Sequence, residues 1–218
     1  MIQEIRAAIF DLDGVIVDTA KYHFLAWQRL AKTYGFEFDQ ADNERLKGVS
    51  RTRSLEILLE IGGLNPDDLA RQAMADQKNR WYIEYVCRMD ASEILPGVEH
   101  YLKILQERKV KTAIGSASRN APLILERVGI SSLFDVIIDG SQVQQAKPDP
   151  EVFLRASEEL RIPPENCVVF EDSEAGIEAA HRAGMEAVGI GKPEILKDAD
   201  MVIRGLHQLV ILVCPINP

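Results

Sequence analysis

Short apolar runs recur along the 218-residue chain, and each ends in small or polar residues before a segment with helical periodicity begins. Continuous apolar runs are typical of strands buried on both faces, and helices of about 10–15 residues between such strands indicate parallel βαβ units. The sequence therefore predicts an α/β fold, a doubly wound, Rossmann-like parallel sheet with helices on both faces. The predicted strands cover residues 6–10, 111–115, 136–138, 167–170, 187–190 and 201–203, and the predicted helices of this sheet domain cover 97–109, 119–128, 150–160 and 173–183.

One long stretch departs from this alternation and has helical periodicity only. It extends from about residue 19 to residue 90, and glycines and an Asn-Pro pair divide it into helices near 24–34, 54–61 and 69–86. We expect a helical cap domain of residues 19–90, inserted after the first strand of a core formed by residues 1–18 and 91–218. The two connections, near residues 15–20 and 90–96, would act as hinges.

Charge and hydropathy exclude several classes of partner. The chain has 34 acidic and 25 basic residues, a formal net charge of −9, and no long basic run. It is therefore a poor match for nucleic acid or an anionic membrane surface. The first residues lack the apolar core of a signal peptide, and the longest apolar stretch, 209–216, is too short to span a bilayer. We expect a cytoplasmic protein whose three cysteines (Cys87, Cys167 and Cys214) are small buried side chains in a reducing compartment, with no disulfide or zinc framework.

Two acidic residues follow the first predicted strand directly. In an extended chain, residues i and i+2 share a face, so Asp11 and Asp13 are expected to point into one crevice while Leu12 points away. Two adjacent carboxylates repel each other and need a cation or a shared proton. A single Asp-Leu-Asp-Gly segment is also compatible with an ordinary polar strand end and turn.

Other predicted strand ends add groups suited to a phosphorylated ligand. Ser116 and Ser118 precede a helix whose N-terminal amides could bind an anion, although Ser118 could equally be a plain N-cap. Lys147 could neutralise a phosphate, although a single lysine is more often a solvated charge. The carboxyl ends of parallel strands meet at one crevice, so Asp172 would join Asp11 and Asp13 there as oxygen ligands for Mg²⁺.

Four segments in order along the chain resemble the motifs of the haloacid dehalogenase superfamily of phosphotransferases. They are DLDGV at 11–15, GSAS at 115–118, the lysine of AKPDP at 147, and FEDSEAG at 170–176. The insert also matches a superfamily cap in its position. The resemblance implies that Asp11 is a nucleophile that becomes an aspartyl phosphate, and that Asp13 is a general acid/base and ligates Mg²⁺ through its backbone carbonyl. It further implies that Ser116 and Lys147 hold the transferring phosphoryl group and that Glu171 and Asp172 complete the Mg²⁺ site.

The predicted cap carries a second set of candidate residues. Thr19, His23 and Trp27 follow one another at intervals of four and would share a helix face, where a tryptophan is commonly core and a histidine commonly structural. The segment 45–51 holds three bases, and the planar guanidinium of Arg51 suits a phosphate.

Longer stretches of the chain resemble the β-phosphoglucomutase family within this superfamily. They are residues 18–27, LKGVSR at 46–51, the Lys78-Asn79 pair and GSASRNAPLILERVGI at 115–130. The resemblance implies interconversion of β-glucose 1-phosphate and β-glucose 6-phosphate through a bisphosphate. Arg119 stands where these enzymes commonly have lysine. The substrate-binding residues implied are Thr19, His23, Trp27, Lys47, Gly48, Val49, Ser50, Arg51, Ser54, Lys78, Ser116, Ala117, Ser118, Arg119, Asn120 and Lys147.

Two other functions remain open at this level. A sugar-phosphate phosphatase of the same superfamily would share every core residue. A phospho-accepting signalling domain also gathers acids and a lysine at strand ends, but its acceptor lies on a later strand, it has no inserted cap, and it lacks the second aspartate that Asp13 provides. We expect a monomer that binds a small phosphorylated sugar, and the residues from Gln208 onward match no pattern we can use.

Overall fold

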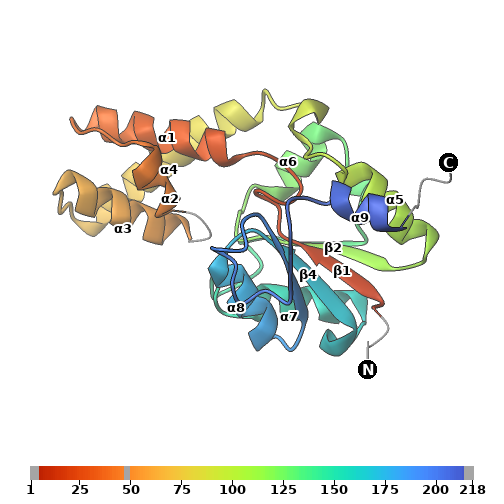
Figure 1. Ribbon diagram of the computed structural model, residues 1–218. Coiled ribbons are helices and arrows are strands. Elements are labelled where there is room, and N and C mark those ends of the chain that lie inside the picture. The colour runs from red at the N-terminus through yellow and green to blue at the C-terminus, as the bar shows by residue number, and fades with distance from the viewer. Residues whose placement is uncertain (1–4, 47–49, 214–218) are drawn as a thin grey trace.

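The computed structural model describes residues 5–46 and 50–213, with the backbone alone for 211–213. Its centre is a six-stranded sheet in the order β3-β2-β1-β4-β5-β6, in which every neighbouring pair is parallel (Figure 1). The predicted doubly wound α/β fold is confirmed. The strands are β1 (Ala7–Phe10), β2 (Lys111–Gly115), β3 (Val136–Ile138), β4 (Cys167–Glu171), β5 (Glu186–Ile190) and β6 (Met201–Ile203).

Helices cover both faces of this sheet because its strands are apolar on both. Ala8 and Phe10 of β1 belong to one buried cluster, together with side chains of α5, α6 and the segment before α9, whereas Ala7 and Ile9 belong to a second cluster with α7 and α8. Stacking of Phe10 on Phe170 of β4, with ring centroids 4.8 Å apart, joins the central strands. The helices are α5 (Val98–Glu107), α6 (Ala121–Val128), α7 (Glu151–Leu160), α8 (Glu174–Arg182) and α9 (His207–Val213), with short 3₁₀ turns η1 (Ala91–Glu93), η2 (Ser131–Leu133) and η3 (Pro164–Asn166).

The register of the central strands determines where their carboxyl ends lie. Phe10 at the end of β1 is paired with Ile114 of β2 and with Phe170 of β4. The residues that follow these three strands therefore meet at one edge of the sheet, as expected for a parallel α/β fold.

Among the residues that the structure describes between β1 and η1, four helices form the insert. They are α1 (Ala20–Thr33), α2 (Gln40–Glu44), α3 (Arg51–Gly62) and α4 (Asp68–Val86). The hydroxyl of Ser50 caps α3 by accepting a hydrogen bond from the Arg53 amide, and the carboxylate of Asp67 caps α4 in the same way through Ala70. In Figure 1 the insert stands to one side of the sheet, above the edge at which the strands end. The division into a core of 1–18 and 91–218 and a cap of 19–90 stays a prediction.

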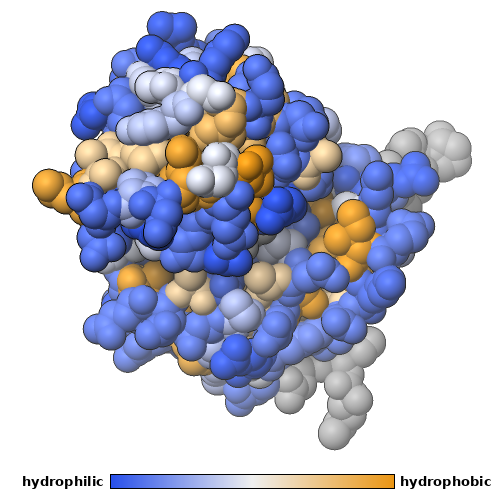
Figure 2. All heavy atoms as spheres, turned by 90° about the vertical axis from the view of Figure 1, so that its left-hand side faces the viewer, coloured by the Kyte–Doolittle hydropathy of each residue, from blue (hydrophilic) through white to orange (hydrophobic). Residues whose placement is uncertain are grey.

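The surface of the insert is largely polar. Figure 2 shows hydrophilic side chains over most of this face, with a smaller group of apolar side chains in its upper half. The large exposed apolar residues of the insert are Leu25, Tyr34 and Leu69. No described helix combines the length and apolar character needed to cross a bilayer.

One prediction about the cysteines is wrong. Cys167 is buried as expected, but Cys87, which directly follows the last residue of α4, is exposed. Cys214 lies outside the described residues.

Candidate active site

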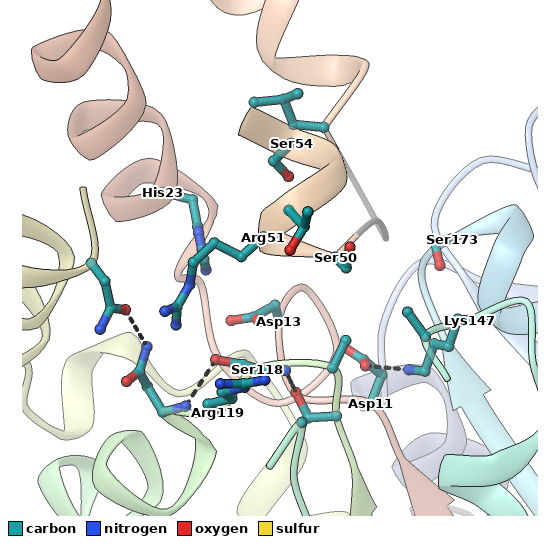
Figure 3. A pocket seen from close by; sticks show the side chains of 18 of the residues that line it. Asp11, Asp13, His23, Ser50, Arg51, Ser54, Ser118, Arg119, Lys147 and Ser173 are labelled. Carbon is teal, nitrogen blue, oxygen red and sulfur yellow. Dashed lines mark hydrogen bonds and ion pairs between the residues drawn. The ribbon is translucent and has the colours of Figure 1, made fainter. Parts of the chain in front are cut away.

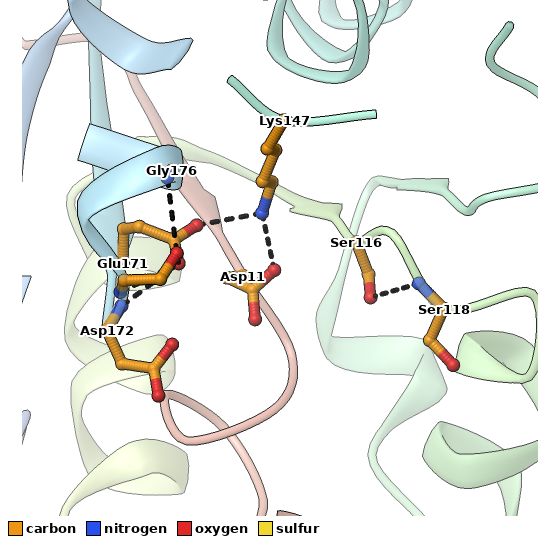
Figure 4. A network of polar contacts seen from close by, with 8 residues as sticks. Asp11, Ser116, Ser118, Lys147, Glu171, Asp172 and Gly176 are labelled. Atoms are coloured by element: carbon orange, nitrogen blue, oxygen red, sulfur yellow. Dashed lines mark hydrogen bonds and ion pairs between the residues drawn. The ribbon is translucent and has the colours of Figure 1, made fainter. Parts of the chain in front are cut away.

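A buried lysine joins two acidic side chains at the sheet edge (Figure 4). Lys147 Nζ lies 2.5 Å from Asp11 Oδ1 and 2.8 Å from Glu171 Oε2. Asp11 follows β1, Glu171 is the last residue of β4, and Lys147 belongs to the loop between β3 and α7. Burial disfavours the charged lysine, but Asp11 and Glu171 together hold the pKa of Lys147 above its ordinary value.

The same edge holds more negative charge than Lys147 can neutralise. Carboxylate oxygens of Asp11, Glu171 and Asp172 lie within 4.8 Å of one another. Burial, reinforced by Glu171 and Asp13, raises the pKa of Asp11 to about 7, although Lys147 opposes this effect. Burial and the charges of Glu171 and Asp11 raise the pKa of Asp172 to about 8. Three oxygen donors around one point, with an uncompensated charge, fit a hard divalent cation such as Mg²⁺.

Local backbone features hold these acids in place. Glu171 Oε1 accepts hydrogen bonds from the amides of Asp172 and Ser173 and from the Ser173 hydroxyl. A Cβ at Gly14, whose φ is +86°, would lie 2.2 Å from Asp172 Oδ2, and a Cβ at Gly176 would lie 2.0 Å from Glu171 Cδ. Both glycines are therefore needed for the acids to occupy these positions.

Asp13 has a different partner from the other acids. Its carboxylate accepts a hydrogen bond from the hydroxyl of Thr19, the residue before α1. Burial raises the pKa of Asp13, while the bond from Thr19 and the charge of Lys147 oppose that rise. Thr19 is fully buried and does not line the cavity. Its side-chain contact in this structure is with Asp13, and the expectation that Thr19 contacts the substrate stays a prediction.

Hydroxyl and amide groups follow β2, the strand next to β1 in the sheet. The buried Ser116 accepts a hydrogen bond at its Oγ from the amide of Ser118, 3.1 Å away. The Ser118 hydroxyl in turn accepts from the Asn120 amide at 3.3 Å, just before α6 begins. The side-chain amide of Asn120 donates to Asn79 of α4 over 3.2 Å and so connects the sheet edge with the insert.

The insert contributes a pair of basic groups, the buried Lys78 and the half-buried His23. Lys78 Nζ of α4 lies 2.9 Å from His23 Nδ1 of α1 and packs over the ring of Trp27, 4.5 Å from its centroid. Burial and the charge of Arg51 lower the pKa of Lys78 to about 7. Burial and the nearby Lys78 lower the pKa of His23 well below its ordinary value.

Arg51 begins α3 and faces the sheet edge. Burial and the charge of Arg119 lower its pKa, so two guanidinium groups, one from the insert and one from the sheet edge, repel each other across the cavity. Figure 3 shows His23, Ser50, Arg51 and Ser54 on the insert's side of the cavity. It shows Asp11, Ser118, Arg119 and Lys147 on the sheet's side.

These groups line one cavity of about 700 Å³ between the insert and the sheet edge. Lys47, Gly48 and Val49 lie outside the described residues. The predicted residues that line the cavity are Asp11, Asp13, His23, Trp27, Ser50, Arg51, Ser54, Lys78, Ser116, Ala117, Ser118, Arg119, Asn120, Lys147, Glu171 and Asp172.

Comparison with known proteins identifies the family of this site. The sequence model of the family of haloacid dehalogenase-like hydrolases matches residues 5–184 of this chain. These residues include every group described above at the sheet edge. The chain belongs to this family. Its fold and its acidic sheet edge are therefore those of a haloacid dehalogenase-like enzyme.

Similar proteins within the haloacid dehalogenase-like hydrolases include both mutases and phosphatases. The chain is 42% identical to the β-phosphoglucomutase of Bacillus subtilis over 94% of its own length and 92% of the relative's. It is 35% identical to a phosphorylated-carbohydrate phosphatase of Thermotoga maritima, over 84% and 83% of the two chains. The crystal structure of β-phosphoglucomutase from Clostridium difficile superposes with a TM-score of 0.89 at 42% identity, covering 94% and 93% of the chains.

Sequence reasoning missed several cavity residues of this haloacid dehalogenase-like enzyme. Gln72, Ala75 and Asp76 of α4 line the cavity with Lys78 and Asn79 because these residues recur at intervals of three and four on one helix face. That spacing could have identified them. The loop before Lys147 adds Val143, Gln144 and Gln145, for which the sequence carries no comparable signal.

Proposed function

We propose that the chain is a Mg²⁺-dependent phosphomutase that interconverts β-glucose 1-phosphate and β-glucose 6-phosphate through an aspartyl phosphate and glucose 1,6-bisphosphate. The observation that carries the proposal is that one cavity has cationic groups on both of its sides. Lys147 lies beside Asp11 at the sheet edge, and Arg51 reaches in from the insert toward Arg119. A substrate with a phosphate at each end matches such a cavity. The 42% identity to a β-phosphoglucomutase supports the same reading.

The metal would be held by the acidic edge. Asp11, Glu171 and Asp172 supply carboxylate oxygens, and Asp13 would add its backbone carbonyl. When bound, Mg²⁺ supplies positive charge that offsets the negative charge of the phosphoryl oxygens.

Asp11 is the nucleophile of the proposed reaction. One of its carboxylate oxygens attacks phosphorus, the bond from phosphorus to the sugar oxygen breaks, and the phosphoryl group passes to Asp11. Lys147 and the Ser116 hydroxyl neutralise and orient the transferring group, because phosphoryl transfer depends mainly on positioning and on charge compensation. Lys147 therefore changes partners during the cycle, from the free carboxylate to the phosphoryl oxygens.

Asp13 moves the proton. It gives a proton to the sugar oxygen that leaves phosphorus, and in the reverse direction it removes the proton from the hydroxyl that attacks the aspartyl phosphate. Burial raises the pKa of Asp13, which favours the protonated form needed for the first of these steps. Thr19 donates its hydroxyl to the Asp13 carboxylate and so holds that carboxyl group in orientation.

The idle phosphate needs a second site. A bisphosphate intermediate must turn so that each phosphate in turn faces Asp11, and the other phosphate would then lie between Arg51 and Arg119. Two guanidinium groups that repel each other in the free protein become stabilised once a phosphate lies between them. The sugar would contact His23, Trp27, Ser54 and Lys78. Lys47, Gly48 and Val49 complete the proposed contacts from outside the described residues.

A phosphatase for small sugar phosphates is the second candidate. The phosphorylated-carbohydrate phosphatase of Thermotoga maritima, at 35% identity, favours it. Such an enzyme would use the same core residues, with water in place of the sugar hydroxyl in the second step. It has no need for a second phosphate site, which is why Arg51 separates the two candidates.

The proposal also includes a cytoplasmic monomer that acts on a small phosphorylated sugar and binds neither nucleic acid nor membrane. Its test is a product assay. Purified enzyme is incubated with β-glucose 1-phosphate, Mg²⁺ and a trace of glucose 1,6-bisphosphate. The mutase produces glucose 6-phosphate in excess of free phosphate, whereas free phosphate as the main product would assign the chain to the phosphatases.

A further inference from the structure

Glu93 connects the two segments that link the insert to the sheet domain. It is the last residue of η1, on the returning segment, and its carboxylate lies against the first turn of α1, on the outgoing segment. Tyr22 donates its hydroxyl to Glu93 Oε1 over 2.5 Å, and Lys21 Nζ lies 2.6 Å from Glu93 Oε2. The Glu93 side chain is only 12% exposed, whereas the Lys21 side chain is 47% exposed, so the carboxylate is shielded while much of its basic partner faces solvent. We name Lys21, Tyr22 and Glu93 the Glu93 cluster.

The backbone reinforces the same connection. The Asp18 amide donates to the Glu93 carbonyl at 3.0 Å, and the Leu95 amide donates to the Ile16 carbonyl at 2.9 Å. An antiparallel bridge pairs Val17 with Ile94 between these bonds. The outgoing and returning segments therefore form one two-stranded connection. The side chain of Glu93 joins this connection to the start of α1.

The cluster extends to the other long helix of the insert. The Tyr22 ring stacks on Tyr85 of α4, with centroids 6.3 Å apart. Burial and the Glu93 carboxylate raise the pKa of the Tyr22 hydroxyl, so it remains a donor at neutral pH. Glu93 thus contacts α1 directly and α4 through Tyr22.

The three contacts of Glu93 surround Thr19. Asp18 precedes Thr19, and Lys21 and Tyr22 follow it within one helical turn. Thr19 donates its hydroxyl to Asp13, and His23, the next residue after Tyr22, lies 2.9 Å from Lys78. The turn that Glu93 holds is therefore the turn that orients Asp13 and places His23.

We propose that Glu93 is a positioning residue. By binding Lys21 and Tyr22, it fixes the first turn of α1 on the two-stranded connection. Thr19 is thereby held against Asp13, and His23 is held where it contacts the sugar. This inference rests on the proposed function, in which Asp13 transfers the proton. Glu93 touches neither substrate nor metal. Loss of the cluster should therefore slow the transfer between Asp11 and the sugar oxygen, but should spare phosphorylation of Asp11 by a small donor that needs no sugar contact.

The test compares Glu93→Ala, Tyr22→Phe and the double variant in two reactions of the Mg²⁺-loaded enzyme. The first is turnover of β-glucose 1-phosphate, and the second is the rate at which acetyl phosphate phosphorylates Asp11, measured by rapid quench. We expect Glu93→Ala to lower kcat with the sugar phosphate by about tenfold, the usual scale for a lost hydrogen bond to a charged group, with KM changed less than threefold. The rate of Asp11 phosphorylation by acetyl phosphate should stay within about twofold of the wild type. The double variant should be no slower than Glu93→Ala with the sugar phosphate, because both substitutions remove one interaction.

Glu84→Gln is the matched control. It removes an exposed ion pair between α4 and Arg29 of α1, with N and O atoms 3.4 Å apart, on the same two helices but away from the connection. Sugar-phosphate turnover of this variant should equal that of the wild type. Tyr22→Phe removes a single oxygen, so the test remains valid if Glu93→Ala does not fold.

Three results would overturn the inference: wild-type kcat in Glu93→Ala, equal losses with the two phosphate donors, or effects of Tyr22→Phe and Glu93→Ala that multiply fully in the double variant. The products of the wild-type reaction test the proposed function separately. If they are glucose and free phosphate, the mutase proposal fails, and the ratio between the two donors still measures the role of Glu93.

Discussion

Lys147 Nζ and Asp11 Oδ1 lie 2.5 Å apart, although 136 residues separate them in the chain. The contact brings the nucleophile proposed here together with the cation that would compensate the incoming phosphate. It forms because β1 and β4 are adjacent in the sheet and the loop after β3 folds back over their ends. Lys147 is buried among acids, which keeps it charged, so the free site already carries a fixed positive charge.

Asp11→Asn should abolish phosphoryl transfer while preserving the fold. The amide has nearly the same shape but is not a nucleophile, and one of the three clustered carboxylates loses its charge. Turnover should fall by several orders of magnitude and Mg²⁺ affinity should weaken. The measurements are turnover with contaminating wild type excluded, Mg²⁺ titration and thermal unfolding. Substantial transfer by the purified variant would disprove the assignment of Asp11.

Asp13→Asn should impair proton transfer to and from the sugar oxygen and leave Mg²⁺ binding largely unchanged. The side chain of Asp13 is not part of the three-carboxylate cluster found among the described residues. We expect a loss of about 10²–10⁴ in kcat, the usual contribution of general acid/base catalysis, with Mg²⁺ affinity close to that of the wild type. Steady-state kinetics and Mg²⁺ titration check this. Near wild-type turnover of a sugar phosphate would exclude Asp13 as the acid/base.

Arg51→Ala should distinguish the mutase from the phosphatase. Removing a charge-assisted bond to the idle phosphate should cost about 1.5–3 kcal/mol, or about tenfold to more than a hundredfold in mutase kcat/KM. Transfer from acetyl phosphate to water does not use this second site and should change little. Arg53→Ala is the control on the same helix, because Arg53 is exposed and pairs with Glu56 and Glu60. Equal losses in both reactions would indicate a defect in the insert instead.

The stability of the metal-free protein should fall as the pH rises. Asp172 has a pKa of about 8 in the folded protein against an ordinary value of 3.8, so the folded state holds its proton more tightly than the unfolded state. The resulting stability is present in full below the ordinary pKa and is lost as the pH rises through about 8. Thermal unfolding in EDTA should therefore show a Tm that falls between about pH 5 and pH 8, and less steeply in Asp172→Asn.

Mg²⁺ should reverse that loss, because a cation compensates the charges that form. At 100 times its Kd the ion should add about 2.7 kcal/mol of stability, or roughly 5–10 °C in Tm for a chain of this length. The shift should be larger at high pH and much smaller in Asp172→Asn. Equal shifts in both proteins would mean that the ion binds elsewhere.

The strands were predictable because each is a continuous apolar run that contrasts with its neighbours. All six lie within two residues of their predicted limits. Helix α2 was missed because five residues give too few turns for periodicity to register, and its capping box at Asp39 and Asp42 was the only local signal. Helix α9 was missed because its apolar run was judged against a membrane span, whereas it packs beside α5.

The sheet edge was predictable residue by residue, since position at a strand end and a parallel register together bring Asp11, Ser116 and Glu171 to one place. The side-chain contacts of the insert were less predictable from the sequence. Thr19 shares its spacing with His23 and Trp27, but its position at the start of α1 turns it toward Asp13. The contacts of Glu93 depend on two segments about seventy residues apart in sequence, and no local pattern in either reveals them.

In the proposed reaction, phosphorylated Asp11 gives its phosphoryl group to a sugar and not to water. The most direct measurement labels Asp11 with radioactive acetyl phosphate in the presence of Mg²⁺, then adds β-glucose 1-phosphate and follows the label by rapid quench. We expect most of the label to pass to glucose 1,6-bisphosphate and then to glucose 6-phosphate, faster than it appears as free phosphate. Release of the label as free phosphate at the same rate with and without the sugar phosphate would contradict it.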